Sequence, residues 1–264
     1  MALALLLAWA APAGAAVVQG AGEPAAQEPA PSQEPAPKDD RRTLRRLPLN
    51  WVRGFYVVFD RDSVAPLLVG GIASAGVLPL DDDVRHAVAN PASGFGKTLE
   101  TAGGTPSAIL VAGLFTAGRL VENERFRAMS YDLAEAAVVN GVYTQVLKLA
   151  VRRERPDGSN NQSFPSGHSS NAFVLATVVE RHYGWKVGLP AYVLAAAVGY
   201  SRIVRDKHYL SDVLAGATLG VIVGHAVVRG NGGPVPESAR RSAYWMIAPV
   251  LTREARGLSF AIVF

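Results

Sequence analysis

Three polar clusters, each at the end of an apolar segment, constrain the fold of this chain more than any other feature. The clusters read K-L-A-V-R-R-E-R-P at 148–156, P-S-G-H at 165–168 and S-R-I-V-R-D-K-H-Y-L-S-D at 201–212. Apolar segments of this kind favour helices, and their order allows the polar ends to converge. Together the clusters supply fixed cations, two imidazoles, a carboxylate and a turn that contains glycine. This set suits an anion of the size of phosphate.

The apolar segments predict an all-α bundle of about six helices. Residues 63–80 and 101–118 carry no charged side chain and just reach the length of a membrane span, whereas the other segments are shorter and rich in Ala and Gly. Small residues allow close packing in membrane bundles and in soluble ones alike. We expect a bundle that is embedded in a membrane or lies against one. The shorter segments are 136–147, 169–179, 187–201 and 213–228.

The N-terminal part of the chain predicts export. Residues 1–15 combine an apolar run with a small-residue site, as in a secretory signal peptide, and no lysine or arginine precedes the run. Residues 16–46 are rich in Pro, Ala and Glu and end in a basic arm at 41–46, which predicts a disordered linker. The arm is either solvated or placed on an anionic membrane face. The main domain is then expected at 47–230.

The C-terminal tail, 231–264, has a different pattern. Residues alternate in polarity at 244–251 and 258–264, around the polar stretch 253–257, which indicates a β-hairpin packed on the helical body. The chain has no cysteine, so disulfides, thiolate catalysis and cysteine-bound zinc are excluded. Its net charge of +4 is compatible with an anionic substrate or a lipid surface.

The first cluster offers two cations to an anion. Lys148 and Arg155 are seven residues apart, or two helical turns, and Pro156 places Arg155 just beyond the end of the helix. A guanidinium can bind two phosphate oxygens at once, while an ammonium acts as a point charge. Taken alone, a basic helix end of this kind is usually solvated.

The second and third clusters add proton chemistry. Ser166 is a candidate N-cap, Gly167 lets a ligand approach the backbone, and His168 follows at the first turn of a helix. His208 and Asp212 have the i, i+4 spacing at which a carboxylate can orient an imidazole, with Arg202 six residues upstream. Each cluster taken alone has an ordinary explanation as a cap or an ion pair.

The three clusters together resemble the signature of the type 2 phosphatidic acid phosphatase (PAP2) superfamily, which also contains the vanadium haloperoxidases. That signature is K-x6-R-P, then P-S-G-H, then S-R-x5-H-x3-D, and no signature residue is missing here. The resemblance covers about a quarter of the chain by motif and implies the helical bundle of that family. The loop at 157–164 looks short for the family.

The resemblance implies a metal-independent phosphatase that needs no cofactor and forms a phosphohistidine. His208 would be the nucleophile, Asp212 would hold its ring, and His168 would protonate the leaving oxygen. The groups that the resemblance assigns to the phosphoryl oxygens are Lys148, Arg155, Ser166, Gly167 and Arg202.

Several functions remain open from the sequence. The first is hydrolysis of phosphate monoesters or diphosphates of lipids on the periplasmic side of the cell envelope, with the membrane surface as a partner and no role for nucleic acid. The second is a soluble exported acid phosphatase of broad specificity. A vanadate-dependent haloperoxidase and an anion-binding module without catalysis are further alternatives. The sequence does not indicate an oligomeric state.

Overall fold

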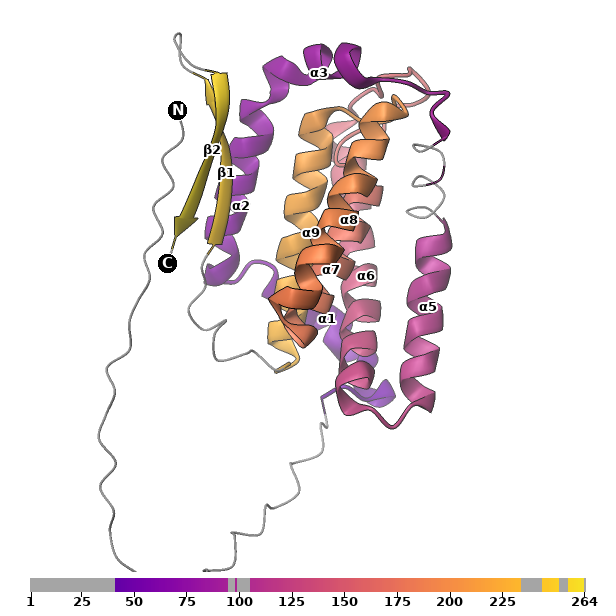
Figure 1. Cartoon of the computed structure of the whole chain (residues 1–264). Coiled ribbons are helices and arrows are strands. Elements are labelled where there is room, and N and C mark those ends of the chain that lie inside the picture. Colours follow the sequence, from indigo (N-terminus) through magenta and orange to yellow (C-terminus); the bar gives the residue numbers. More distant parts are fainter. Residues whose placement is uncertain (1–40, 95–97, 99–104, 234–243, 252–255, 264) are drawn as a thin grey trace, which may run out of the picture. The chain divides into compact units, whose positions relative to one another are not determined.

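The computed structural model describes residues 41–94, 98, 105–233, 244–251 and 256–263. The expected signal peptide and nearly all of the expected linker lie outside these residues. The described part of residues 41–233 is helical (Figure 1). This confirms the all-helical class expected from the apolar segments.

The described apolar segments that predicted helices lie in helices, except that the segment 63–80 is divided between α2 and η2 by a turn at Val77, and residues 101–104 are outside the described chain. These segments correspond to α2, α5, α6, α7, α8 and α9, while α1 and α3 come in addition to the expected helices. The helices are η1 (Leu44–Arg46), α1 (Leu47–Val57), α2 (Arg61–Gly76), η2 (Leu78–Leu80), α3 (Asp81–Val88), α5 (Thr105–Leu120), α6 (Glu124–Val151), α7 (Gly167–Tyr183), α8 (Trp185–Val204) and α9 (Leu210–Gly230).

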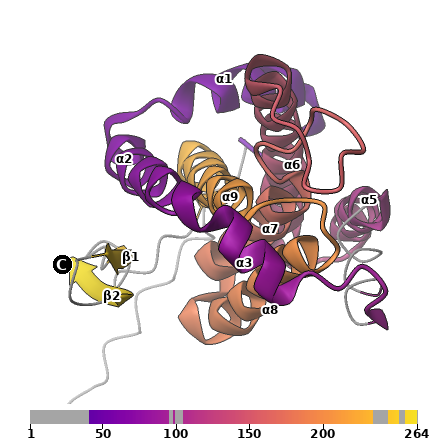
Figure 2. The same cartoon turned by 90° about the horizontal axis from the view of Figure 1, so that it is seen from above.

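Helix α7 packs against α6, α8 and α9, and the view from above shows it between these neighbours (Figure 2). Its buried apolar side chains meet those of α6 and α9 in one hydrophobic core. Burial of apolar surface is the main favourable contribution to such packing. The most buried members of this core include Leu133, Val139, Val174, Val178, Val223 and Val228.

Glycines bring α9 unusually close to α7. A Cβ at Gly216 would lie 2.4 Å from the carbonyl oxygen of Ser166, and one at Gly220 would lie 2.3 Å from the carbonyl oxygen of Ser170. No side chain fits at these distances, so the two backbones touch directly. This contact holds the start of α7, with the P-S-G-H turn, beside the start of α9.

Three helical stretches are long and apolar enough to cross a membrane: Arg61–Val88, Trp185–Val204 and Leu210–Gly230. The first stretch contains the expected span 63–80, whereas the expected span 101–118 lies partly outside the described residues and overlaps the shorter apolar helix Ala108–Leu120. The segments in α8 and α9 were expected to be too short, because their uncharged runs end at polar residues that continue the helices. The full length of a helix, polar ends included, is therefore a better guide to a possible membrane span than the length of its uncharged run alone.

The two ends of the described chain add smaller elements. Strands β1 (Tyr244–Leu251) and β2 (Arg256–Val263) pair antiparallel, with Tyr244 opposite Val263. The packing of this tail on the helical body stays a prediction. At the other end Arg42, part of the expected solvated arm, is instead buried and contacts Asp132 of α6.

Candidate active site

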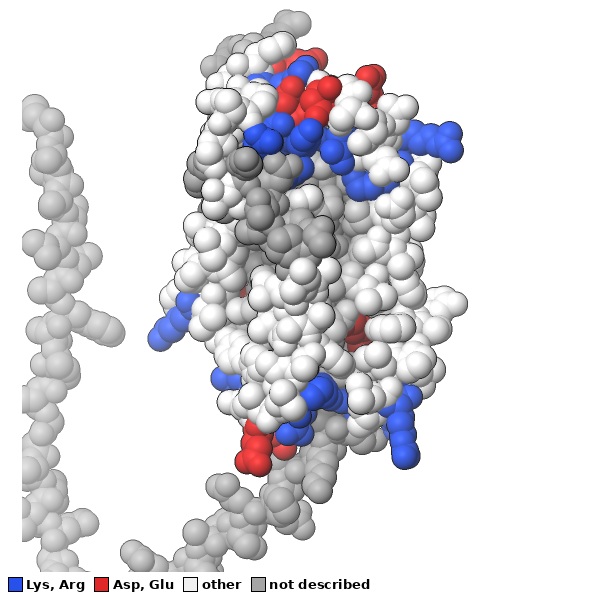
Figure 3. All heavy atoms as spheres, turned by 90° about the vertical axis from the view of Figure 1, so that its right-hand side faces the viewer, with Lys and Arg blue, Asp and Glu red and all other residues white. Residues whose placement is uncertain are grey.

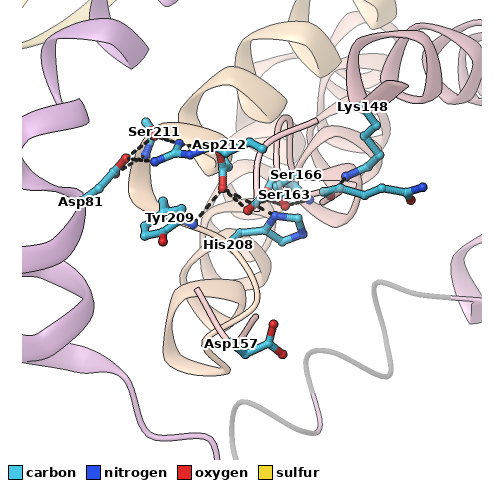
Figure 4. Close-up of polar contacts among 12 residues, drawn as sticks. Asp81, Lys148, Asp157, Ser163, Ser166, His208, Tyr209, Ser211 and Asp212 are labelled. Atoms are coloured by element: carbon cyan, nitrogen blue, oxygen red, sulfur yellow. Dashed lines mark hydrogen bonds and ion pairs between the residues drawn. The ribbon is translucent and has the colours of Figure 1, made fainter. Parts of the chain in front are cut away.

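The three polar clusters meet where α6 and α8 end and α7 and α9 begin (Figure 4). Lys148 lies in the last turn of α6, which ends when Arg152 adopts a left-handed backbone conformation at φ 50°. Arg155 follows beyond the helix, as Pro156 predicted. The chain can therefore turn back toward the start of α7 instead of continuing away from it.

The loop between α6 and α7 is held by its own hydrogen bonds. The N–H of Arg155 donates to the carbonyl of Asn160 at 3.0 Å, and the N–H of Ser163 donates to the carbonyl of Arg153 at 2.9 Å. Lys148 Nζ donates to the carbonyl of Gln162 at 2.5 Å. The short loop thus fixes both the ammonium and Ser163.

The expected cations converge in a buried place. Lys148 is 9% exposed and Arg202 2% exposed. The pKa of Lys148 is lowered to about 8, chiefly by burial and then by the positive charge of Arg155, with the opposing charge of Asp212 and a smaller effect of Arg202. Like charges gathered away from water raise each other's energy, so an anion placed between them would be bound strongly.

The P-S-G-H turn forms the neighbouring wall. Ser166 is the N-cap of α7, as expected, and its own N–H donates to the carbonyl of Asp212 at 2.9 Å. A Cβ at Gly167 would lie 4.0 Å from Lys148 Cε, so this turn adjoins the ammonium. His168, the second residue of α7, is half-buried.

His208 and Asp212 do not lie on one turn of the same helix, although their spacing had predicted that they would. His208 precedes α9, and its Nδ1 lies 3.8 Å from Asp212 Oδ2, which is an ion-pair distance and not a hydrogen bond. Asp212 instead caps α9, because its Oδ2 accepts the N–H of Tyr209 at 2.9 Å. Burial lowers the pKa of His208 to about 4, and the charge of Lys148 acts in the same direction. His208 is therefore a neutral imidazole at neutral pH.

The sequence analysis missed the residues that hold Asp212. Ser163 Oγ donates to Asp212 Oδ2 at 2.5 Å, and Arg153 Nη1 donates to Asp212 Oδ1 at 2.8 Å. Arg153 also contacts Asp81 at the start of α3, which is far away in the sequence. The only signal for Arg153 was its place inside the first cluster, and Asp81 had none.

The assembled site can bind a tetrahedral anion and offer it a neutral imidazole. Cations and backbone N–H groups at the start of a helix stabilise negative charge, and a neutral imidazole can act as a nucleophile. Among the residues that the structure describes, no group of three or more His, Asp or Glu side chains is arranged to hold a metal ion.

The comparisons with known proteins point the same way. Residues 130–232 match the family model described as the PAP2 superfamily. Lipid A 1-phosphatase of Porphyromonas gingivalis is 42% identical over 80 residues, which are 29% of this chain and 18% of that protein. Phosphatidylglycerophosphatase B of Bacillus subtilis is 36% identical over 94 residues, covering 30% of this chain and 46% of that protein.

A third relative, decaprenylphosphoryl-5-phosphoribose phosphatase of Mycobacterium tuberculosis, is 35% identical over 105 residues, covering 36% of this chain and 57% of that protein. The matches thus span less than two thirds of the length of each relative. Among solved structures, the crystal structure of Aquifex aeolicus LpxE superposes with a TM-score of 0.48 at 23% identity, covering 57% of this chain and 95% of that one. Residues 130–232, which contain the three motifs, are thus similar to the PAP2 superfamily.

Proposed function

We propose that this protein is a phosphatase that hydrolyses lipid phosphates through a phosphohistidine. The observation that carries the proposal is the convergence of Lys148, Arg155 and Arg202 beside a neutral His208. In the described residues, Arg155 Nε is buried without a hydrogen-bond partner. Buried polar groups without partners point to a ligand that completes the site.

The proposed reaction has two displacements at phosphorus. His208 forms a bond to phosphorus through Nε2 while the bond to the leaving oxygen breaks, and His168 donates a proton to that oxygen. Water then attacks the phosphohistidine, gives its proton to His168 and releases phosphate. The three cations and the N–H groups at the start of α7 stabilise the charge on the phosphoryl oxygens in both transition states.

The reaction proceeds in this proposal without a metal ion. The cations already supply the positive charge that a divalent metal brings to phosphoryl transfer. Asp212 faces His208, where it stabilises the ring when the ring becomes positively charged. The carboxylate therefore serves the nucleophile and not a metal.

Three observations favour a lipid substrate and a site in the cell envelope. Three described helical stretches have the length and apolar character of membrane spans. On the face shown in Figure 3, charged side chains gather mainly toward the two ends of the bundle and leave a largely uncharged band between them. The relatives named above carry the names of phosphatases that act on lipid phosphates. Export to the periplasmic side belongs to the same proposal.

The test uses the full chain, purified in detergent, with a panel of lipid A, phosphatidylglycerol phosphate, phosphatidate, undecaprenyl diphosphate and a soluble aryl phosphate. We expect release of phosphate from at least one lipid in the presence of a chelator, and labelled enzyme after an acid quench. Activity that needs added magnesium would refute the metal-independent reaction. Turnover of the aryl phosphate alone, by protein found in the soluble fraction, would favour the exported acid phosphatase.

A further inference from the structure

A buried ion pair lies behind Asp212, on the side away from His208. Arg153 Nη2 donates to Asp81 Oδ2 at 2.8 Å, and Arg153 Nη1 donates to Asp212 Oδ1 at 2.8 Å. One guanidinium thus bridges two carboxylates, of which Asp81 is 3% exposed and Asp212 fully buried. Asp81 belongs to α3, outside the residues that match the family.

The surroundings hold this bridge in one geometry. Ser211 donates to Asp81 through its N–H at 2.9 Å and through its Oγ at 2.5 Å, and it accepts from Arg153 Nη1 at 2.6 Å. The guanidinium carbon of Arg153 lies 4.1 Å from the ring centre of Tyr209, in a cation–π contact. Figure 4 shows Asp81 reaching toward Ser211 from the neighbouring helix.

The two oxygens of Asp212 have different tasks. Oδ1 accepts from Arg153, while Oδ2 accepts from Ser163 and from the N–H of Tyr209 and lies nearest to His208. A carboxylate paired with a full positive charge presents less negative charge to its other neighbours. Asp81 offsets part of the positive charge of Arg153. Arg153 then offsets less of the negative charge of Asp212, and Asp212 presents more negative charge to its other neighbours.

We propose that Arg153 and Asp81 are positioning residues, which together set how much negative charge Asp212 presents to the nucleophile His208. The inference rests on the proposed function for the role of His208 as the nucleophile. The direction in which Arg153 and Asp81 shift the pKa of His208 does not depend on that function. Arg153 weakens the support that Asp212 gives to a positively charged imidazole, and Asp81 strengthens it. The two residues therefore act on His208 with opposite signs.

The other charges around His208 stay the same in this comparison. Asp212 comes from α9, Lys148 from α6 and Arg202 from α8, and all three act on the ring. Arg155 from the loop acts on Lys148, and His168 lies at the start of α7. Beyond the bridge, Arg85 of α3 is paired with Asp206 at 2.7 Å. Variants of Arg153 and Asp81 leave these groups in place.

The decisive measurement is the pKa of His208, followed by nuclear magnetic resonance with ¹⁵N-labelled histidine in the detergent-solubilised full chain. The His208 signal is assigned by its loss in His208→Ala. We expect Arg153→Gln to raise this pKa and Asp81→Asn to lower it, each by about 0.5 to 1 pH unit, the size expected for one charge at short range in a partly buried site. The double variant should return close to the parent value.

Kinetics provide a second measurement. Arg153→Gln should raise kcat by up to about tenfold and Asp81→Asn should lower it by a similar factor, because the charged imidazole is supported more in the first variant and less in the second. KM should change little, because the bridge does not contact the substrate. Arg153→Lys keeps the charge but loses the second hydrogen bond, so its kcat and pKa should lie close to the parent values. The matched control is Arg152→Gln, which removes the same charge from the exposed neighbouring residue and should change neither quantity.

Shifts of the same sign for Arg153→Gln and Asp81→Asn, or no shift in either, would overturn the inference, because a purely structural role predicts no opposite effects on His208. If Arg153→Gln does not fold, with two carboxylates left facing each other, the double variant and Asp81→Asn alone carry the same comparison. The pKa measurement needs no substrate. It therefore fails or succeeds independently of the proposed phosphatase activity.

Discussion

The bundle has a buried polar cluster at each end, and the two clusters are built in opposite ways. At the end away from the active site, Asp132 accepts from Arg42 through both oxygens at 2.8 Å and from Asn231 at 2.9 Å, and lies 2.8 Å from His182 Nε2. Asp132 and Lys148 are sixteen residues apart on α6, which corresponds to about 24 Å along the helix. The clusters are therefore separate.

The difference lies in the balance of charge. At the far end the carboxylate of Asp132 is surrounded by donors from the N-terminal arm, α7 and the end of α9, so its negative charge is offset within the protein. At the candidate site, several cations lie around a neutral imidazole, so the cluster carries an excess of positive charge. We infer that one cluster holds helix ends together, whereas the other, under the proposed function, is stabilised when a phosphoryl group binds. Mutations should separate these roles.

The largest effect should come from the nucleophile. We expect His208→Ala to lower turnover of every substrate by at least about 10⁴-fold, whatever the leaving group, because no phosphohistidine can form. The measurement is kcat/KM with acid-quench trapping of labelled enzyme. Label still trapped in this variant would show that another residue is the nucleophile.

The next effect separates the two histidines of the site. His168→Ala should lower kcat/KM for alkyl phosphates by about 10² to 10⁴-fold, because an alkoxide needs a proton to leave. An activated aryl phosphate, whose phenolate leaves readily, should lose much less. Equal losses on both substrates would contradict the assignment of His168 as the general acid.

The complete cluster should show the reverse pattern. Asp132→Ala removes the acceptor of Arg42 and His182 and should lower the free energy of unfolding by about 3 to 5 kcal/mol, as for other broken buried pairs. The kcat of the protein that remains folded should not change. The control is Asp62→Ala, because the exposed pair of Asp62 and Arg229 should contribute less than about 1 kcal/mol. A loss of kcat in Asp132→Ala without a loss of stability would contradict the structural role of this cluster.

The smallest effect is a shift in pH dependence. The pKa of Lys148 is lowered to about 8, so in the free enzyme its positive charge is present below that pH and lost above it. We expect kcat/KM to fall above about pH 8 and the fall to move to higher pH in Lys148→Arg, since arginine keeps its charge. If the fall of kcat/KM at high pH is unchanged in Lys148→Arg, another group is responsible for it.

The sequence predicted the parts of the site that depend on local structure. The end of α6 before Arg155 and the cap at Ser166 follow from proline and serine, whose effects on a neighbouring helix end are short-range. His208 and Asp212 lie 3.8 Å apart, as their spacing predicted, but His208 precedes α9 and the Asp212 carboxylate also caps that helix. The spacing of two residues does not reveal such competition for one side chain.

Contacts between distant segments could not be predicted in the same way. Arg153 and Asp81 are 72 residues apart, and Arg42 and Asp132 are 90 residues apart. Their pairing depends on how α3 and the N-terminal arm lie on the bundle, which no local pattern encodes. A single arginine among several in a basic segment looks solvated until its partner is known.

The glycine contacts between α7 and α9 have a consequence for exchanging segments between related proteins. Because Gly216 and Gly220 touch carbonyl oxygens of α7 with no room for a Cβ, the two helices fit only as a matched pair. A chimera that receives α7 from a relative should keep its activity only if α9 comes from the same donor. Helix α5 has a close contact of this kind with α6, since a Cβ at Gly118 would lie 2.8 Å from Ser130 Cβ, so α5 and α6 should be exchanged together.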